Sequence, residues 1–178
     1  MALRPVLQFP DARLKRVSEP IEKITDELRL LAQDMLDVMY DEPGIGLAAA
    51  QVGESVRMIV VDTEWKDEEV GGERRPLVLL NPEIVHREGS LIWTEACLSV
   101  PDFSAEVERS ALVRVRGLDL EGREVVEEAS DLRAVCFQHE IDHLNGILFI
   151  DRISRLKRSL YVSKRRKAAR EEEAQGAR

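Results

Sequence analysis

The chain has 178 residues and a mass of 20.2 kDa, and 44% of its residues are hydrophobic. This length suits one compact domain with a buried core. The formal net charge of -8 argues against a general nucleic-acid binder, and two cysteines are too few for a disulfide framework. Because no N-terminal apolar run resembles a signal peptide or a membrane span, we expect a cytoplasmic protein with neither a membrane nor DNA as its partner.

The N-terminal part of the chain predicts an extended arm followed by a helix. Three prolines interrupt residues 3–20 and disfavour helix there. Thr25 precedes two acidic residues and is a suitable helix N-cap, and apolar residues then recur at helical spacing as far as Tyr40. Pro43-Gly44 ends this pattern, so we expect the first helix over residues 25–40.

Residues 44–53 combine closely spaced glycines, small apolar residues and one glutamine. They lack the Lys-Ser/Thr ending of a phosphate loop and the third glycine of a dinucleotide fingerprint. Glycines let the backbone approach a ligand closely, and an amide such as Gln51 can donate to a developing oxyanion. The same pattern also suits a tight turn that feeds a well-packed segment.

The middle of the chain predicts several short strands. Their β-branched and apolar runs cover residues 56–62, 76–80, 84–87 and 90–93. We expect turns at Asn81-Pro82 and Gly89, and an exposed loop over residues 64–75. His86 has charged neighbours, so we interpret it as an exposed strand residue and not as a ligand. Later, residues 112–118 and 124–128 alternate apolar and polar side chains around Glu121-Gly122, which predicts a hairpin.

The most informative motif is Gln138-His139-Glu140-Ile141-Asp142-His143. On a helix, residues four apart lie on one face, so His139 and His143 can bind one metal ion with Glu140 beside them to transfer a proton. Suitable capping residues place this helix between residues 130–131 and Asn145-Gly146. Since strands and helices do not alternate, the pattern predicts an α+β fold with antiparallel β-sheets packed around this central metal-binding helix, plus an N-terminal helix and a C-terminal helix.

An open catalytic metal site usually has three protein ligands, so a third must be found. Phe149 stands where a metzincin would have its last histidine, and the glutamates beyond His143 all lie in a charged tail. Cys97 is the leading candidate, because a thiolate and two imidazoles make a tetrahedral site with one open position. The competitor Cys136 is on the same predicted helix as the histidines. A helix does not readily place three of its own side chains around one ion, which favours a core position for Cys136.

Three segments together resemble the signature motifs of peptide deformylases, in the same order and at similar spacing. They are Gly44-Ile45-Gly46-Leu47-Ala48-Ala49-Ala50-Gln51, Glu95-Ala96-Cys97-Leu98-Ser99 and Gln138-His139-Glu140-Ile141-Asp142-His143-Leu144. The resemblance implies one catalytic domain over residues 1–178, with a basic helix and tail at about 154–178. It also implies a metal-dependent hydrolase that removes the N-formyl group from the initiator methionine of nascent polypeptides and releases formate.

The resemblance implies a role for each motif residue. The implied metal ligands are Cys97, His139 and His143. The implied catalytic groups are Glu140 as proton carrier, and Gln51 and the backbone N–H of Leu98 as donors to the formyl oxygen. The implied substrate-binding residues are Ile45, Gly46 and Glu95, and the expected border of the methionine pocket is Ile45, Ile92, Val135 and His139. Fe(II) is expected in the cell, while thiolate and imidazole ligands also suit Zn(II), Ni(II) or Co(II) in the purified protein.

Two departures from the family pattern affect the expected cleft. Ala96 stands where the second motif usually has glycine, and if that position requires a positive φ, alanine costs about 1 kcal/mol. After Pro101, many bacterial members carry an arginine near the peptide path, whereas this chain has Asp102-Phe103-Ser104. Neither departure changes a metal ligand, so we expect them to affect peptide preference and catalytic efficiency.

Residues 154–170 predict a basic helix, with no acidic residue between Leu156 and Arg170. Such a helix on an acidic protein suits RNA, and the resemblance implies docking on the ribosome near the peptide exit. A solvated terminal helix explains the same pattern. Two rival functions are a metal amidase with an altered substrate and a ribosome-associated protein with little activity, and the complete set of site residues argues against the latter.

Overall fold

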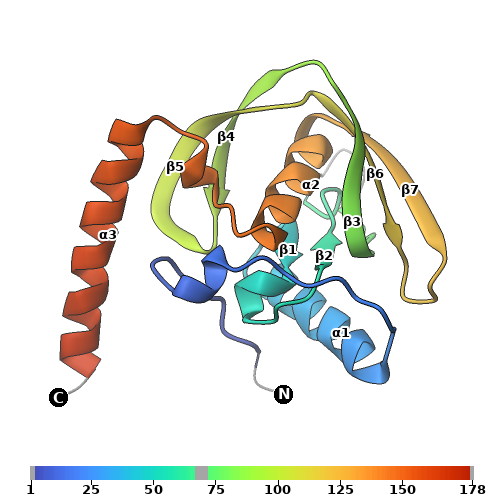
Figure 1. Ribbon diagram of the computed structural model, residues 1–178, viewed down its shortest axis with the longest axis horizontal. Helices are drawn as coiled ribbons and strands as arrows, with labels where there is room; N and C mark the ends of the chain where they lie inside the picture. Colours follow the sequence, from blue (N-terminus) through green and yellow to red (C-terminus); the bar gives the residue numbers. More distant parts are fainter. Residues whose placement is uncertain (1–2, 67–71, 177–178) are drawn as a thin grey trace.

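The computed structural model describes residues 3–66 and 72–176 (Figure 1). The helices are α1 (Asp26–Asp41), α2 (Asp131–Leu144) and α3 (Arg155–Gly176), with short 3-10 turns at Ala12–Lys15, Ala49–Val52 and Phe149–Asp151. The strands are β1 (Gly46–Ala48), β2 (Met58–Val61), β3 (Leu77–Glu88), β4 (Leu91–Cys97), β5 (Val100–Arg109), β6 (Leu112–Leu118) and β7 (Glu124–Ser130). Among the described residues, no helix has both the length and the apolar character that a membrane crossing requires.

Two antiparallel sheets enclose the central helix α2, as the sequence predicted. One sheet has the strand order β1-β2-β3-β6-β7, and the other pairs β4 with β5. Figure 1 shows α2 between them. Phe137, Ile141 and Leu144 of α2 pack in one core cluster with Val113 and Val115 of the larger sheet. The helix therefore buries apolar side chains while its remaining face carries the polar motif.

Helix α1 packs in a second apolar cluster, which includes Met58 and Val60 of β2. Its predicted N-cap is confirmed, because Thr25 Oγ1 accepts a hydrogen bond from the backbone N–H of Leu28 at 3.4 Å. The buried residues of α1 are Leu31, Ala32, Met35, Val38 and Met39, at the helical spacing that the sequence predicted. The cluster also includes Leu47 of β1, so α1 supports the edge of the larger sheet.

The predicted turn at Asn81-Pro82 is wrong. Strand β3 continues through it, with a register shift between the pairs Leu80–Leu118 and Glu83–Arg116. Asn81 has a φ of 50°, and its side-chain amide accepts from the N–H and donates to the carbonyl of Ile21, both at 2.8 Å. The irregularity is therefore a bulge that fastens the N-terminal arm to the sheet.

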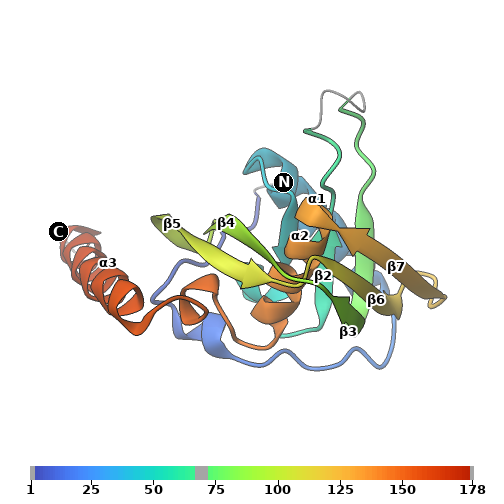
Figure 2. The same cartoon turned by 90° about the horizontal axis from the view of Figure 1, so that it is seen from above.

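Other segments extend or complete the predictions. The hairpin β6–β7 and the exposed position of His86 are confirmed. Strand β5 was not predicted, and α3 continues to Gly176 beyond the expected end at residue 170. The expected loop over residues 64–75 includes residues 67–71, which lie outside the described residues. Figure 2 shows α3 projecting from the body of the molecule.

Candidate metal centre

Helix α2 and strand β4 bring three candidate ligands together. His139 and His143 lie one turn apart on α2, with their Nε2 atoms 3.2 Å apart. Cys97 ends β4, and its Sγ lies 3.3 Å from His143 Nε2. The three ligand atoms are all within 4.8 Å of one another. The chain separates Cys97 from the helix by more than 30 residues, so only the fold makes this cluster.

The spacing of the three atoms fits a small divalent ion. Tetrahedral bonds of about 2.0–2.1 Å to nitrogen and about 2.3 Å to sulfur put donor atoms roughly 3.3–3.6 Å apart. The observed separations of 3.2 and 3.3 Å are close to that range. Burial lowers the pKa of His143 well below its usual value, which keeps this imidazole in the neutral form that binds a metal. The donor set is thus suited to a metal in chemistry as well as in distance.

Cys136 is separate from this cluster. Its side chain is 4% exposed, and its S–H group donates to the carbonyl oxygen of Ile45 at 3.5 Å. Burial raises the pKa of the thiol well above its usual value, so it stays protonated. The residue packs in the core cluster around α2, in the position that the sequence favoured for it.

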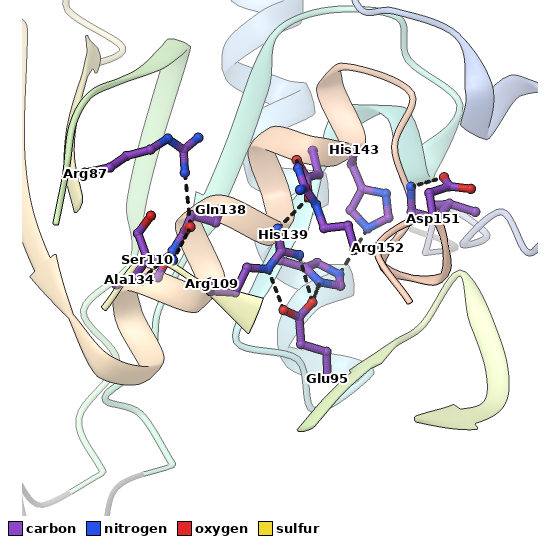
Figure 3. A network of polar contacts seen from close by, with 12 residues as sticks. Arg87, Glu95, Arg109, Ser110, Ala134, Gln138, His139, His143, Asp151 and Arg152 are labelled. Carbon is purple, nitrogen blue, oxygen red and sulfur yellow. Dashed lines mark hydrogen bonds and ion pairs between the residues drawn. The ribbon is translucent and has the colours of Figure 1, made fainter. Parts of the chain in front are cut away.

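A network of ion pairs lies behind His139 (Figure 3), and its members Glu95, Arg109 and Asp142 are buried. His139 Nδ1 is 2.7 Å from Glu95 Oε2, and Arg109 donates to both oxygens of Glu95 at 2.6 and 2.9 Å. Arg109 also donates to Asp142 at 2.6 Å, and Arg152 donates to both oxygens of Asp142. Contact with the Nδ1 atom leaves Nε2 of His139 directed toward the cluster, as in carboxylate–histidine–metal arrangements.

Glu95 lines the cleft, but its carboxylate is bound to neighbouring side chains. Its side chain is 3% exposed, and Arg109 and His139 occupy both carboxylate oxygens. Burial by itself would raise the pKa of Glu95, but the hydrogen bonds from Arg109 and His139 outweigh it and lower that pKa to about 2. A carboxylate held in this way orients the histidine, and it offers a peptide no free oxygen.

Sequence reasoning missed Arg109 and Arg152. Each lies outside the motifs, and no local pattern marks it. Arg109 ends β5 and reaches Glu95 on the paired strand β4, whereas Arg152 follows the 3-10 turn at Phe149–Asp151. The one sequence signal was the pair of acidic residues, Glu95 and Asp142, because buried carboxylates require partners.

Glu140 follows His139 on α2 and lines the cleft. It is 4% exposed, and burial raises its pKa to about 7. Its Oε2 atom finds no hydrogen-bond partner within the part of the chain that the structure describes. A carboxylate with a pKa near neutrality can both accept and return a proton at physiological pH.

The cleft itself has a volume of about 800 Å³. Its apolar side is lined by Ile45, Trp93, Leu132, Val135 and Cys136. The expectation for Ile92 is wrong, because that side chain is 69% exposed and does not line the cleft. Neighbouring residues of a strand point to opposite faces of the sheet, so Trp93, the next residue of β4, lines the cleft instead of Ile92.

The two groups expected to hold the formyl oxygen border the same cleft. Gln51 is 2% exposed, and its Oε1 accepts from the backbone N–H of Ala48 at 2.9 Å. Its Nε2 lies 3.2 Å from Ser99 Oγ and 3.6 Å from Cys97 Sγ, so the amide donor is fixed beside the cluster. Leu98 follows Cys97 directly and also lines the cleft.

Ala96 fits its position without backbone strain. It lies in the extended strand β4 opposite Ser104 and does not have a positive φ. The sequence suggested that alanine would cost stability here if the position required a positive φ, and this cost therefore does not arise. The residues after Pro101 line the cleft as expected, and Asp102 among them has a φ of 57°.

A cysteine sulfur from β4 lies beside two imidazoles and a buried glutamate on a helix between antiparallel sheets. This arrangement defines a metallohydrolase of the His-Glu-x-x-His class. Residues 3–159 match the family model described as polypeptide deformylase. The chain belongs to this family.

Relatives and solved structures agree with this assignment. A peptide deformylase from Afipia carboxidovorans is 53% identical over 171 residues, which are 96% of this chain and 98% of that protein. A peptide deformylase structure from Legionella pneumophila has a TM-score of 0.85 and 41% identity, covering 99% of both chains. A peptide deformylase from Ehrlichia chaffeensis, solved in complex with actinonin, has a TM-score of 0.86 and 36% identity, covering 94% of this chain and 98% of that one.

Proposed function

We propose that this chain removes the N-formyl group from the initiator methionine of nascent polypeptides and releases formate, acting as a single catalytic domain in the cytoplasm. The observation that carries the proposal is the cluster of Cys97, His139 and His143 beside Glu140, at a cleft that Cys97, His139 and Glu140 line together with apolar side chains. Membership of the polypeptide deformylase family supports the same reaction.

Cys97, His139 and His143 would hold one divalent metal ion. We propose Fe(II) as the ion in the cell because the chain belongs to the polypeptide deformylase family. The thiolate and imidazole ligands suit Fe(II), and they suit Zn(II), Ni(II) or Co(II) in a purified sample as well. Such an ion supplies Lewis acidity that activates water and polarises the formyl carbonyl. Glu95 keeps His139 oriented for this task from behind.

Glu140 is the proposed proton carrier. Its carboxylate accepts the proton of the water that attacks the formyl carbon, and it returns that proton to the methionine nitrogen as the C–N bond breaks. The immediate products are formic acid, which keeps the second proton of the water, and a peptide with a neutral amino group. Formic acid then releases that proton to solvent as formate, and the amino group takes up a proton, so atoms and charges balance. Its raised pKa of about 7 suits both steps.

Gln51 and the backbone N–H of Leu98 are the proposed donors to the formyl oxygen as that oxygen gains charge. The amide of Gln51 is buried and already oriented by Ala48 and Ser99, so little reorganisation accompanies the reaction. The methionine side chain would occupy the apolar side of the cleft near Trp93 and Val135, and the peptide would extend along Ile45 and Gly46.

Formate release from formyl-Met-Ala-Ser tests this function, with protein purified without oxygen and loaded separately with Fe(II), Ni(II) or Zn(II). Turnover should require metal and fall by at least about 100-fold in Glu140→Ala, while metal binding persists. If the native protein binds metal but releases acetate from acetyl-Met peptides and no formate, the alternative of a metal amidase with another substrate is correct.

We also propose that α3 docks on the ribosome. The exposed residues Lys164, Arg166 and Lys167 lie on this projecting helix, whereas Tyr161 and Arg165 contact the body of the molecule (Figure 2). Reversing the three exposed charges to glutamate should abolish salt-sensitive cosedimentation with ribosomes and leave turnover of short peptides unchanged. Unchanged cosedimentation would contradict this proposal.

A further inference from the structure

Two side chains outside the motifs are bonded to the wall of the cleft and to the residue that precedes it, Pro43. This wall is the segment Gly44–Gly46, whose residues line the cleft. Trp65 Nε1 donates a hydrogen bond to the carbonyl oxygen of Gly44 at 2.9 Å, and Lys66 Nζ donates to the carbonyl oxygen of Pro43. Trp65 itself does not line the cleft, so it contacts the wall without reaching a substrate.

The indole of Trp65 is held by neighbouring side chains. Its ring packs edge-on against Tyr40, with centroids 5.3 Å apart and an interplanar angle of 89°. The guanidinium of Arg74 lies 4.1 Å from the Tyr40 centroid and 5.8 Å from the Trp65 centroid. Edge-to-face and cation–π contacts each restrict the ring, so its N–H group keeps one direction.

Asp62 fixes the backbone on which Trp65 is placed. Its side chain is fully buried and accepts the Tyr40 hydroxyl at 2.6 Å. It also accepts three backbone N–H groups, those of Glu64 at 3.2 Å, Trp65 at 3.3 Å and Arg75 at 2.7 Å. A buried carboxylate is costly without such partners, so this arrangement is resistant to opening.

The wall is also in close contact with α2. A Cβ atom at Gly46 would lie 2.6 Å from Glu140 Oε1 and 2.7 Å from Cys136 Sγ. The carbonyl oxygen of Ile45 accepts the backbone N–H of Asp62 at 2.9 Å. Hydrogen bonds from the Asp62–Lys66 segment and contact with Glu140 and Cys136 therefore determine together how the wall lies across the cleft.

We infer that Trp65 is a positioning residue, which holds the Gly44–Gly46 wall at the spacing that an extended peptide requires. The inference rests on the proposed function. Trp65 touches no proposed ligand and no proposed catalytic group, so its loss should leave the chemical step on bound substrate intact. It should weaken the binding of the residues that follow methionine, because those residues lie along the wall.

The variant Trp65→Phe tests this inference, because phenylalanine keeps a ring against Tyr40 and removes the N–H donor. One neutral hydrogen bond corresponds to about three- to tenfold in an equilibrium constant. We expect KM for formyl-Met-Ala-Ser to rise by that factor, with kcat changed by less than about twofold. For formylmethioninamide, which has no residue after methionine, both kinetic constants should stay within about twofold of the native values.

The matched control is Glu64→Gln. Glu64 is adjacent to Trp65, and its side chain pairs at the surface with Arg75 at 3.8 Å and does not line the cleft. Its kinetic constants should equal those of the native protein for both substrates. An unchanged tripeptide KM in Trp65→Phe, or an equal loss of kcat for both substrates, would overturn the inference while the proposed function stands. A metal-loaded native protein that releases no formate would overturn the proposed function, and the inference with it.

Discussion

Replacing Glu95 with glutamine tests whether a buried carboxylate supports the metal site from behind. Glu95 Oε2 lies 2.7 Å from His139 Nδ1, and both carboxylate oxygens of Glu95 accept hydrogen bonds from Arg109. The amide has nearly the same shape, but it carries no charge and turns one acceptor into a donor. That donor must face either the guanidinium or the imidazole, so at least one of the hydrogen bonds is lost.

Two effects contribute to the expected magnitude. Loss of the partner that orients a ligand histidine typically lowers metal affinity or activity by about 10- to 100-fold. Removing one partner of a buried ion pair costs about 3–5 kcal/mol of stability. Because Arg109 keeps its hydrogen bond to Asp142 at 2.6 Å, we expect the loss of stability to lie at the lower end of this range, about 3 kcal/mol.

Three measurements check this prediction. They are the metal dissociation constant from competition with a chelator, formate release from the loaded enzyme, and urea unfolding of the metal-free protein. The control is Glu106→Gln on β5, an exposed glutamate that pairs with Thr94 in the strand register and contacts none of the three ligands. A metal affinity in Glu95→Gln within twofold of the native value would refute the proposed support.

Three further substitutions address other parts of the structure. Gly46→Ala places a methyl group 2.6 Å from Glu140 Oε1, so we expect about 1–3 kcal/mol of destabilisation by urea unfolding and at least tenfold slower formate release. Phe137→Ala removes a fully buried ring from the core around α2 and should cost about 3–5 kcal/mol in the same unfolding assay. Asp151→Asn should lower the free energy of unfolding by an amount that depends on pH. Burial by itself would raise the pKa of Asp151, but hydrogen bonds from Lys15 and a backbone N–H outweigh it and lower that pKa. The ionised side chain of Asp151 therefore stabilises the folded protein above the pKa that this residue has in the unfolded chain. This stabilisation disappears as the pH falls below that pKa. The variant should lose about 1 kcal/mol at pH 7, and the difference should narrow between about pH 5 and pH 3. A difference that is constant with pH would contradict the assigned ion pair.

The sequence by itself determined the elements whose signals are local. The cap at Thr25, the boundaries of α2 and the hairpin β6–β7 depend on neighbouring residues, and the structure confirms them. The histidine spacing of four likewise places His139 and His143 on one helix face wherever the helix lies. The position of Cys97 beside them followed from ligand chemistry and the motif resemblance, and the structure brings the three atoms together.

Tertiary structure decided the features that depend on register and on partners far apart in the chain. Whether Ile92 or Trp93 faces the cleft is determined by how β4 pairs with β5, and a shift of one residue exchanges the two faces. The bulge at Asn81 exists because the N-terminal arm offers Ile21 as a partner. The role of Glu95 became apparent only when the fold placed Arg109 against it, since buried charges are defined by partners that no local pattern names.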